Sequence, residues 1–322
     1  MSPSAESANG LPTIFLMPVF EDKRSAECLI SALAKLQLDN AYVVAVEDGS
    51  TIEQLTVDDI SRSGLDGEIL YLRRNVGHQR AIAVGLMHLA AAHDAANVVV
   101  MDSDGEDKPE SAGELLCELQ RSAGDVVVAQ RRRRSETLKF RCFYLIYRFV
   151  FNILTGRTIQ FGNFVALSPR AVQRLAVMQE TAVHFPGAIM ASKLRMISLP
   201  TDRGKRYFGV SKLNFVGLAL HGIRSMMVFA EDILVRAGVF CVALTIASAV
   251  LIAIAGAAKI LGYTSPGWFT TVVGVLLILV MQSGVLTFVT LMMSGIIRSS
   301  ASVEQTNLLS LIDRVISTRN SS

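Results

Sequence analysis

The residues best suited to chemistry are a group of acids that follows an apolar run. Val98–Met101 is followed within six residues by four of them, Asp102, Asp104, Glu106 and Asp107. Apolar runs bounded by turn residues are typical of buried strands in a parallel sheet, and ligands bind beyond the carboxyl ends of such strands. Neighbouring carboxylates repel one another unless a cation joins them, and hard oxygen ligands select Mg²⁺ or Mn²⁺. We therefore expect Asp102 and Asp104 to face a divalent metal at the rim of a pocket.

Part of the same stretch also has the pattern of a helix start. Asp107 is followed by Pro109 and Glu110, which is typical of an N-cap with proline in the first turn. Both interpretations can hold together, with Asp107 capping a helix while Asp102 and Asp104 bind the metal.

The elements that must position these acids alternate between strands and helices. Strands are predicted over 13–19, 42–46, 68–72, 98–101 and 125–129, and helices through 26–36, over 80–92 and over 109–121. This alternation gives right-handed βαβ units and a parallel sheet, which is an α/β, Rossmann-like fold. Each of the first four strands ends in polar, charged or glycine residues, and we expect a nucleotide site at these ends.

Composition narrows the class of protein. The chain has 322 residues, of which 51% are hydrophobic, and a net charge of only +3, so charge does not indicate a nucleic-acid partner. The four cysteines form no Cys-x-x-Cys pair and the five histidines show no metal-ligand spacing, so neither a zinc site nor a disulfide framework is indicated. Residues 1–10 are polar, lack the apolar core of a signal peptide and are predicted to be a disordered tail.

The apolar excess lies near the C-terminus. Residues 237–258 carry no charge over about 22 residues, enough to cross a ~30 Å hydrocarbon core, and residues 268–297 form a second uncharged run. Between them, residues 259–267 are predicted to be a turn. Residues 213–235 are apolar but broken by charges, which favours a juxtamembrane helix in the interface. The sequence therefore predicts a two-helix membrane hairpin.

A basic, aromatic segment precedes this region. Arg131–Arg134 leads into residues 135–155, for which we expect a helix lying in the membrane interface, the alternatives being a solvated loop and a buried core helix. The positive-inside rule states that the side of the membrane with more Lys and Arg is cytoplasmic. One side of the predicted hairpin carries Arg224, Arg236, Arg298 and Arg314, and the other carries Lys259. This asymmetry predicts an integral membrane protein whose catalytic domain and C-terminal tail, residues 298–322, are cytoplasmic.

Four motifs occur in the order and spacing of a known family. They are Pro18-Val19-Phe20-Glu21, Glu47-Asp48-Gly49-Ser50, Arg74-Asn75-x-Gly77-His78-Gln79 and Asp102-x-Asp104-x-x-Asp107-x-Pro109-Glu110. Together they resemble the family 2 glycosyltransferases, and most of all the membrane-anchored branch that includes dolichol-phosphate mannose synthase and the bacterial polyprenyl-phosphate glycosyltransferases. Taken alone, the motif at Glu47 is also an ordinary strand-to-turn sequence.

The resemblance implies a GT-A type domain over residues 11–212, a nucleotide-sugar donor, Mg²⁺ or Mn²⁺, and a lipid-phosphate acceptor. The metal positions that it implies are Asp102, Asp104 and Glu106. The substrate-binding positions are Pro18, Phe20, Glu21, Glu47, Asp48, Asn75, Gln79, Asp102, Ser103, Arg131 and Ser211. Glu47 stands where the family usually has Asp, and Glu106 where it often has Gln.

Two further blocks complete the comparison with that family. Arg206-x-x-Gly209-x-Ser211-Lys212 matches a loop expected to fold over the donor, where Arg206 and Lys212 would neutralise the diphosphate leaving group. The alternative is a basic juxtamembrane loop. Phe161–Val165 matches a block that commonly reads Gly-Asp-Phe-Arg, but Asn163 replaces the Asp and Val165 the Arg. The catalytic residues implied are Asp104, Arg206, Lys212 and Asn163.

The expected reaction is inverting transfer of a sugar from a nucleotide diphosphate to polyprenyl phosphate, undecaprenyl or dolichyl, at the cytoplasmic face. One alternative is a hydroxyl acceptor on another lipid or glycolipid, which would need a general base that Asn163 does not supply. Another is a catalytically silent membrane scaffold that binds nucleotide. The sugar, the base and any homo-oligomeric state are left open.

Overall fold

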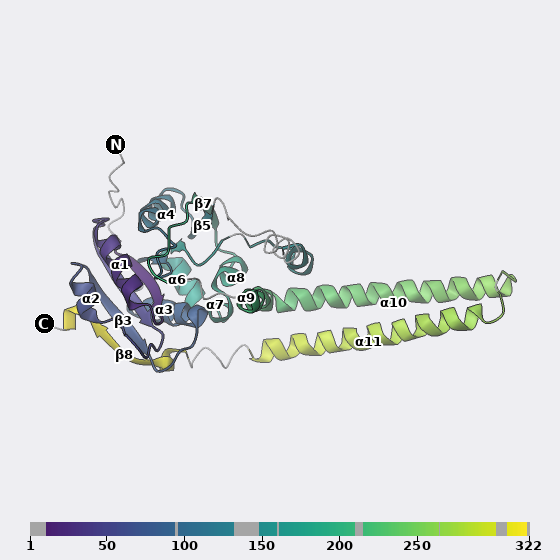
Figure 1. Ribbon diagram of the computed structural model, residues 1–322. Coiled ribbons are helices and arrows are strands. Elements are labelled where there is room, and N and C mark those ends of the chain that lie inside the picture. Colours follow the sequence, from purple (N-terminus) through teal and green to yellow (C-terminus); the bar gives the residue numbers. More distant parts are fainter. Residues whose placement is uncertain are drawn as a thin grey trace. The chain divides into compact units, whose positions relative to one another are not determined.

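The computed structural model describes residues 11–93, 96–131, 148–159, 161–209, 215–263, 265–300 and 308–320. The chain divides into two compact units. The first comprises Met1–Tyr147, Thr158–Val228 and Glu304–Ser322, and the second comprises Arg148–Arg157 and Phe229–Val303. Figure 1 shows the elements of both units along the chain.

The first unit is built on an eight-stranded sheet in the order β7-β5-β6-β4-β1-β2-β3-β8. The strands are β1 Thr13–Val19, β2 Ala41–Glu47, β3 Asp66–Leu72, β4 Asn97–Val100, β5 Val126–Arg131, β6 Val165–Leu167, β7 Met196–Thr201 and β8 Ile312–Ser317. Four neighbouring pairs are parallel and three, those of β6 with β4, β6 with β5 and β8 with β3, are antiparallel. The expected α/β fold with a mostly parallel sheet is confirmed.

Helices cover both faces of this sheet. They are α1 Lys23–Ala34, α2 Val57–Ser61, α3 His78–Ala92, α4 Pro109–Arg121, α6 Pro169–Ala176, α7 Glu180–Val183 and α8 Phe185–Ala191. Helix α9, Phe215–Met227, packs against α7. Because side chains alternate along a strand, Ile14 and Leu16 of β1 pack in one core with α3, α6 and α8. Phe15 and Met17 pack in a second core with α1, α2 and α4. The central strands such as β1 and β4 are therefore buried on both faces, which explains their continuous apolar sequences.

The strand β6 is missed by the sequence analysis. It has only three residues and lies antiparallel between β4 and β5, with Val100 opposite Val165. Three residues are too few to show a period of two. This register is important for the site, because it brings the residues before β6 beside the acids that follow β4.

The strand β8 lies within the segment that the sequence describes only as a polar tail. Tyr71 of β3 pairs with Arg314, whose guanidinium carbon lies 4.4 Å from the centre of the Tyr71 ring. The backbone of Arg73 also donates to the carbonyl of Leu311 over 2.9 Å. Figure 1 shows β8 along the edge of the sheet at β3. The end of the chain is thus a structural part of the first unit.

The second unit contains two long helices packed as a hairpin, α10 Ala230–Ile260 and α11 Trp268–Ser300. Both contain stretches long and apolar enough to cross a membrane, Ala230–Ile260 and Trp268–Met293. Helix α9 ends at Met227, so the break before the first apolar helix falls about seven residues earlier than the sequence analysis placed it. Residues 148–155, the end of the expected interfacial segment, are helical. The rest of that segment lies outside the described residues.

Mostly small or polar side chains form the interface of the hairpin, with Leu276 as the exception. The buried positions recur every seven residues: Cys241, Ser248 and Ala255 on α10, and Leu276, Ser283 and Thr290 on α11. The hydroxyls of Thr245 and Ser283 lie 2.6 Å apart across the interface. Small residues let two helix backbones approach closely, and hydroxyl pairs add hydrogen bonds where no water competes. The large apolar side chains of both helices are exposed on the outside.

Candidate active site

The acids after β4 form a tight loop that is closed by one of its own members. The Asp107 carboxylate accepts a hydrogen bond from the backbone N–H of Asp102 over 3.1 Å. The N-cap of α4 is Lys108, with no side-chain cap, so the expectation that Asp107 caps this helix is wrong. Its carboxylate turns back to hold the loop, and Ser103 lies buried inside it. We call Asp102–Asp107 the acid loop.

Two arginines pair with the acid loop. The Arg206 guanidinium lies 2.6 Å from Oδ2 of Asp104 and 3.6 Å from Oε1 of Glu106, and Arg203 forms an ion pair with Glu106. The other Asp104 oxygen accepts the N–H of Glu106 over 2.9 Å. Burial raises the pKa of Asp104, with the Glu106 N–H and Arg206 acting in the opposite direction. The acid loop is therefore balanced by cations from a segment about 100 residues away.

That segment is bound to the acid loop through its backbone as well. The N–H of Gly204 donates to the Glu106 carbonyl over 2.8 Å, and that of Tyr207 donates to the Asp104 carbonyl over 2.9 Å. Gly105 has a φ of +86°, and a Cβ there would lie 2.5 Å from the Tyr207 ring. Only glycine fits this position without a shift of the ring. Residues 203–207 and the acid loop thus form one structural group.

Asn163 lies beside the acid loop, as the register of β6 requires. Its amide nitrogen is 3.4 Å from Oδ1 of Asp102 and 2.9 Å from Nε2 of His78, and its oxygen accepts from Gln79 over 3.2 Å. His78 is itself 3.0 Å from Asp102. Burial opposes protonation of His78, but the charge of Asp102 prevails and raises its pKa. Sequence reasoning gave His78 no role, although it stands at the start of α3 next to Gln79.

Asp48 connects the ends of two neighbouring strands. Its carboxylate accepts the backbone N–H groups of Val76 over 2.7 Å and of Gly77 over 3.0 Å. Burial raises the pKa of Asp48, while these two hydrogen bonds oppose the rise. Gly49 has a φ of +72°, and a Cβ there would lie 2.6 Å from the backbone of Asn75. Asp48 therefore fixes the loop that presents the exposed Asn75.

Glu21 and Glu47 are engaged within the protein. Glu21 accepts the N–H of Thr51 over 2.6 Å and its hydroxyl over 3.0 Å, and hydrogen bonds from this loop lower the pKa of Glu21. Glu47 is fully buried, which raises its pKa, and it accepts from Ser50 and from the N–H of Leu55. Both carboxylates hold residues 50–55 in place.

At the end of β1, Pro18 is buried and Phe20 is 42% exposed. In the sheet the order β4-β1-β2-β3 is continuous, so the residues following these four strands share one edge. Phe20 and Asn75 are the exposed members of the implied donor-binding set at this edge. They are the surfaces that a donor could contact directly.

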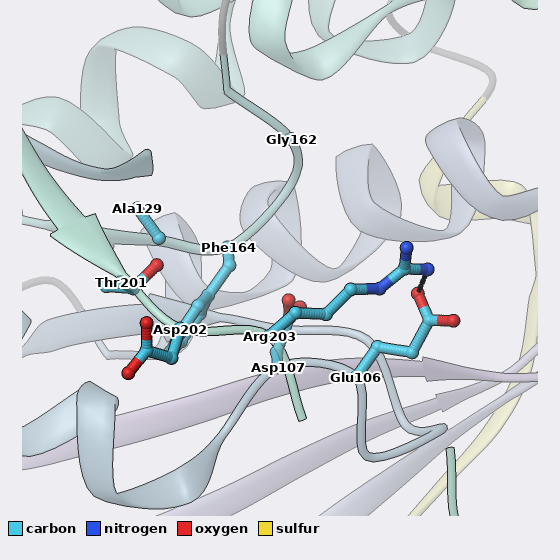
Figure 2. Close-up of a pocket in the computed structure, with 8 residues that line it drawn as sticks. All are labelled: Glu106, Asp107, Ala129, Gly162, Phe164, Thr201, Asp202 and Arg203. Carbon is cyan, nitrogen blue, oxygen red and sulfur yellow. Dashed lines mark hydrogen bonds and ion pairs between the residues drawn. The ribbon is translucent and has the colours of Figure 1, made fainter. Parts of the chain in front are cut away.

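A hollow opens on the other side of the acid loop, with about 270 Å³ of empty space that includes open solvent. Figure 2 shows its lining: Glu106, Asp107, Ala129, Gly162, Phe164, Thr201, Asp202 and Arg203. The lining comes from the ends of β5 and β7, the entry to β6 and the acid loop. The Arg203 guanidinium points to Glu106 across one side of it. The acid loop thus lies between this hollow and the ends of β1, β2 and β3.

Some expected site residues cannot be placed. Ser211 and Lys212 lie outside the described residues, as do three of the four arginines at 131–134. Arg131 ends β5, but its side chain also lies outside the described part of the structure. Of the basic residues that the sequence analysis expects in the site, Arg206 is the one whose contacts the described residues record.

The carboxylate oxygens of the acid loop fit a hard divalent cation, because Mg²⁺ and Mn²⁺ bind such oxygens. The three expected ligands do not converge, however. Among the described residues, the one set of three ligand atoms within 4.8 Å of one another lies elsewhere, at Glu68, His88 and His93. In the acid loop, Asp102 contacts His78 and Asn163, whereas the other two acids are held by the arginines.

This fold and site define a nucleotide-sugar glycosyltransferase. Residues 15–180 match the family described as glycosyl transferase family 2. The chain belongs to this family.

Curated relatives agree with this assignment. An uncharacterized glycosyltransferase, YkoT of Bacillus subtilis, is 24% identical over 75% of this chain and 72% of its own length. The dodecaprenyl-phosphate galacturonate synthase of Rhizobium johnstonii is 26% identical, over 42% of this chain and 40% of its own length.

Solved structures include glucosyl-3-phosphoglycerate synthase of Mycobacterium tuberculosis in complex with Mn²⁺, UDP-glucose and phosphoglyceric acid. It is 17% identical, with a TM-score of 0.49 over 70% of this chain and 80% of that one. TarS of S. aureus, residues 1–349, is 14% identical, with a TM-score of 0.43 over 73% of this chain and 65% of that one.

Proposed function

We propose that this glycosyltransferase moves a sugar from a nucleotide-diphosphate donor to polyprenyl phosphate at the cytoplasmic face of a membrane. The observation that carries the proposal is the hairpin of α10 and α11, which exposes large apolar side chains in a chain that also carries a nucleotide-sugar site. A core helix of a soluble protein would be mostly buried, whereas only 11% of each apolar window is buried. An acceptor that resides in the membrane explains this combination.

The chemistry of the acceptor agrees with the groups in the site. The second pKa of a phosphomonoester is about 6, so a lipid phosphate is largely a dianion at neutral pH. Its oxygen can attack the anomeric carbon without first losing a proton. Asn163, which can only hydrogen-bond, is then sufficient where the family commonly has Asp. A hydroxyl acceptor would instead need a group to take its proton.

What the reaction needs is neutralisation of negative charge. The donor diphosphate gains charge as it leaves, and Arg206, which pairs with Asp104 and lies near Glu106, is a cation that would face it. Asp102 and Asp104, with Glu106 beside them, would hold a divalent cation, which when bound supplies further charge stabilisation for the diphosphate. Arg206 would move from Asp104 to the diphosphate. Arg203, which lines the hollow, would meet the acceptor phosphate.

The test is a direct assay of the lipid product. Full-length protein in lipid nanodiscs is incubated with a panel of nucleotide sugars and a divalent metal, with undecaprenyl phosphate, diacylglycerol or a glycolipid as acceptor in separate reactions. The masses of the lipid products are measured by mass spectrometry. We expect a glycosylated lipid phosphate and stoichiometric release of nucleoside diphosphate. A product formed only with diacylglycerol or a glycolipid would contradict the phosphate acceptor. Donor binding without any turnover would favour the silent scaffold.

A further inference from the structure

Three side chains converge in the first unit at a place that the proposed reaction does not use. They are Glu68 of β3, His88 of α3 and His93, which follows that helix. The Nε2 atom of His88 lies 2.9 Å from Oε1 of Glu68, and the Nε2 atom of His93 lies 3.2 Å from the same oxygen. The three ligand atoms all lie within 4.8 Å of one another. Two imidazoles and a carboxylate thus point at one small volume.

The local fold explains why sequence spacing gave no signal for this cluster. Helix α3 starts at the edge where the donor residues lie and runs back over the sheet, so its last turn reaches the first residues of β3. His88 and His93 are five residues apart, which is not a helical i, i+4 pair. His93, however, leaves the helix with φ −139° and ψ 54°, and this turn returns its ring to Glu68. The third ligand is 20 residues earlier in the chain.

We propose that Glu68, His88 and His93 bind Zn²⁺, at a site separate from the acid loop. Two imidazole nitrogens and one carboxylate oxygen form a known ligand set for zinc. With bonds of about 2.0–2.2 Å in a tetrahedron, ligand atoms lie roughly 3.3–3.5 Å apart. The observed 2.9 and 3.2 Å need only a small outward movement. Imidazole ligands suit zinc, whereas Mg²⁺ prefers carboxylates, carbonyls and water.

The burial of the cluster suits an ion that enters from solvent. The side chain of Glu68 is 9% exposed, that of His88 is 17% exposed and that of His93 is 31% exposed. One ligand is therefore held rigidly in the sheet, while His93 leaves an open side for entry and for a water molecule at the fourth position.

The site would fasten the sheet edge that holds the end of the chain. The Tyr42 ring packs against His93 with ring centres 5.4 Å apart, and the Tyr42 hydroxyl lies 3.4 Å from that of Ser317 in β8. Arg319 stacks over the same Tyr42 ring at 5.8 Å. An ion that fixes His93 would therefore stabilise Tyr42 and, through it, the C-terminal strand. The inferred role is to stabilise this edge of the sheet, and it does not depend on the proposed acceptor.

The experiment measures zinc binding in tag-free, full-length protein in detergent, with Mg²⁺ in large excess to occupy hard-oxygen sites. Competition with a chromophoric chelator gives the stoichiometry and the affinity, and thermal unfolding is followed with and without zinc. We expect a single Zn²⁺ per chain and a higher melting temperature with zinc, because the ion binds only the folded state. His88→Gln and His93→Gln should each weaken binding by more than the about 10–100-fold that loss of a supporting partner costs.

Two control variants separate this site from other carboxylates. Asp104→Asn, in the acid loop, and Glu114→Gln, on the exposed face of α4, should both keep wild-type zinc affinity. Cobalt substitution provides a measurement that needs no variant, since Co²⁺ bound to imidazole in a four-coordinate site gives intense visible absorption. Zinc affinity that is unchanged in both histidine variants, or lost in Asp104→Asn, would overturn the proposal. So would the weak spectrum of six-coordinate, all-oxygen Co²⁺ in the wild-type protein.

Discussion

At the scale of single residues, the carboxylates of the acid loop are neutralised by the arginines that pair with them. Asp104 is engaged twice, since one oxygen meets Arg206 at 2.6 Å and the other holds the loop through Glu106. Asp104 therefore both binds a cation and holds the shape of the loop. Under the proposed function, a divalent metal bound to these carboxylates would release the paired arginines to the diphosphate.

We predict that Asp104→Asn lowers turnover by about two or more orders of magnitude, because it removes a charge that positions the main electrostatic stabilisers of the leaving group. The measurement is the initial rate of lipid-product formation at saturating donor. Glu114→Gln is the matched control and should keep wild-type activity. Full activity in EDTA would contradict the metal part of this prediction, and an active Asp104→Asn would contradict the role of the residue.

A second prediction concerns Asn163, whose amide contacts Asp102, His78 and Gln79 but cannot take a proton. Asn163→Ala should cost much less activity than Asp104→Asn, because only orientation is lost. The rate should rise with pH through the second ionisation of the acceptor phosphate, near about pH 6, and not through a carboxylate near about pH 4. The check is the pH–rate profile of both variants. An Asn163→Ala variant as inactive as Asp104→Asn, with fold and donor binding intact, would favour a hydroxyl acceptor or a silent scaffold.

How well the sequence predicts a residue of the candidate site depends on how closely that residue follows the end of an apolar strand. Asp102, Asp104 and Asp48 closely follow apolar runs, and the alternation of strands and helices along the chain is enough to place them at one edge of the sheet. Arg203 had no such signal, since it follows a half-exposed strand, β7, and its pairing with Glu106 spans 97 residues. The sequence assigns Glu21 and Glu47 to the donor, and a motif does not reveal the hydrogen bonds that both carboxylates accept from residues 50–55.

At the scale of elements, the short helix α2 depends on one buried acid. Asp59 accepts the N–H of Thr56 over 2.9 Å and its hydroxyl over 2.8 Å, and it pairs with Lys23 of α1 at 3.2 Å. Burial opposes the charge on Asp59, but these partners prevail and lower its pKa. A lowered folded-state pKa means that the stabilisation is fully present above about pH 4, the unfolded value, and is lost as the pH falls through the folded value.

We therefore predict that Asp59→Asn destabilises the first unit by about 1–2 kcal/mol at neutral pH, the range for losing a cap. The difference from wild type should shrink as the pH falls below about 4. Thermal unfolding followed by circular dichroism at several pH values measures both effects. Asp58→Asn, the exposed neighbour, is the control and should have little effect. A destabilisation that is equal at neutral and acid pH would show that the charge of Asp59 is not its cause.

The hairpin gives a prediction for a different kind of interface. Ser248 is buried where α10 meets α11, whereas Val250 is 53% exposed. Ser248→Leu should lower the melting temperature of the purified protein, because overpacking costs typically about 1–3 kcal/mol. Val250→Leu, two residues along the same helix, should leave it unchanged. Equal effects of the two substitutions would mean that the seven-residue repeat of small side chains does not form the contact surface.

Long elements were predicted from sequence, and short or distant ones were not. The strand β1 and the helix α4 agree with their predicted ranges residue for residue, since each carries a full apolar pattern and clear end signals. In contrast, β6 has three residues, and β8 is an edge strand whose residues are all exposed or half-exposed, which resembles a polar tail. The strands β8 and β3 pair although they lie far apart in the chain, and local strand propensity does not predict such a pairing.

At the scale of the whole molecule, the two ends of the hairpin connect to the same unit. The segment before α10 and the strand β8 after α11 both belong to the first unit. We therefore predict that residues 259–267 lie on the non-cytoplasmic side and that Ser322 is cytoplasmic with the catalytic site. Paired reporter fusions after Ser322, one active only in the cytoplasm and one only outside it, test this arrangement. Activity of the external reporter alone would reverse the orientation and remove access to cytoplasmic nucleotide sugars.

The position of β8 also has a consequence for the order in which the protein is made. Gly67 hydrogen-bonds to Thr318, 251 residues later in the chain, and both apolar helices are translated between them. The ribosome must therefore complete and release the hairpin before the last strand can reach its place. Until then β3 presents an open edge, which invites pairing with another chain. Completion of the sheet therefore comes only after both apolar helices have been synthesised.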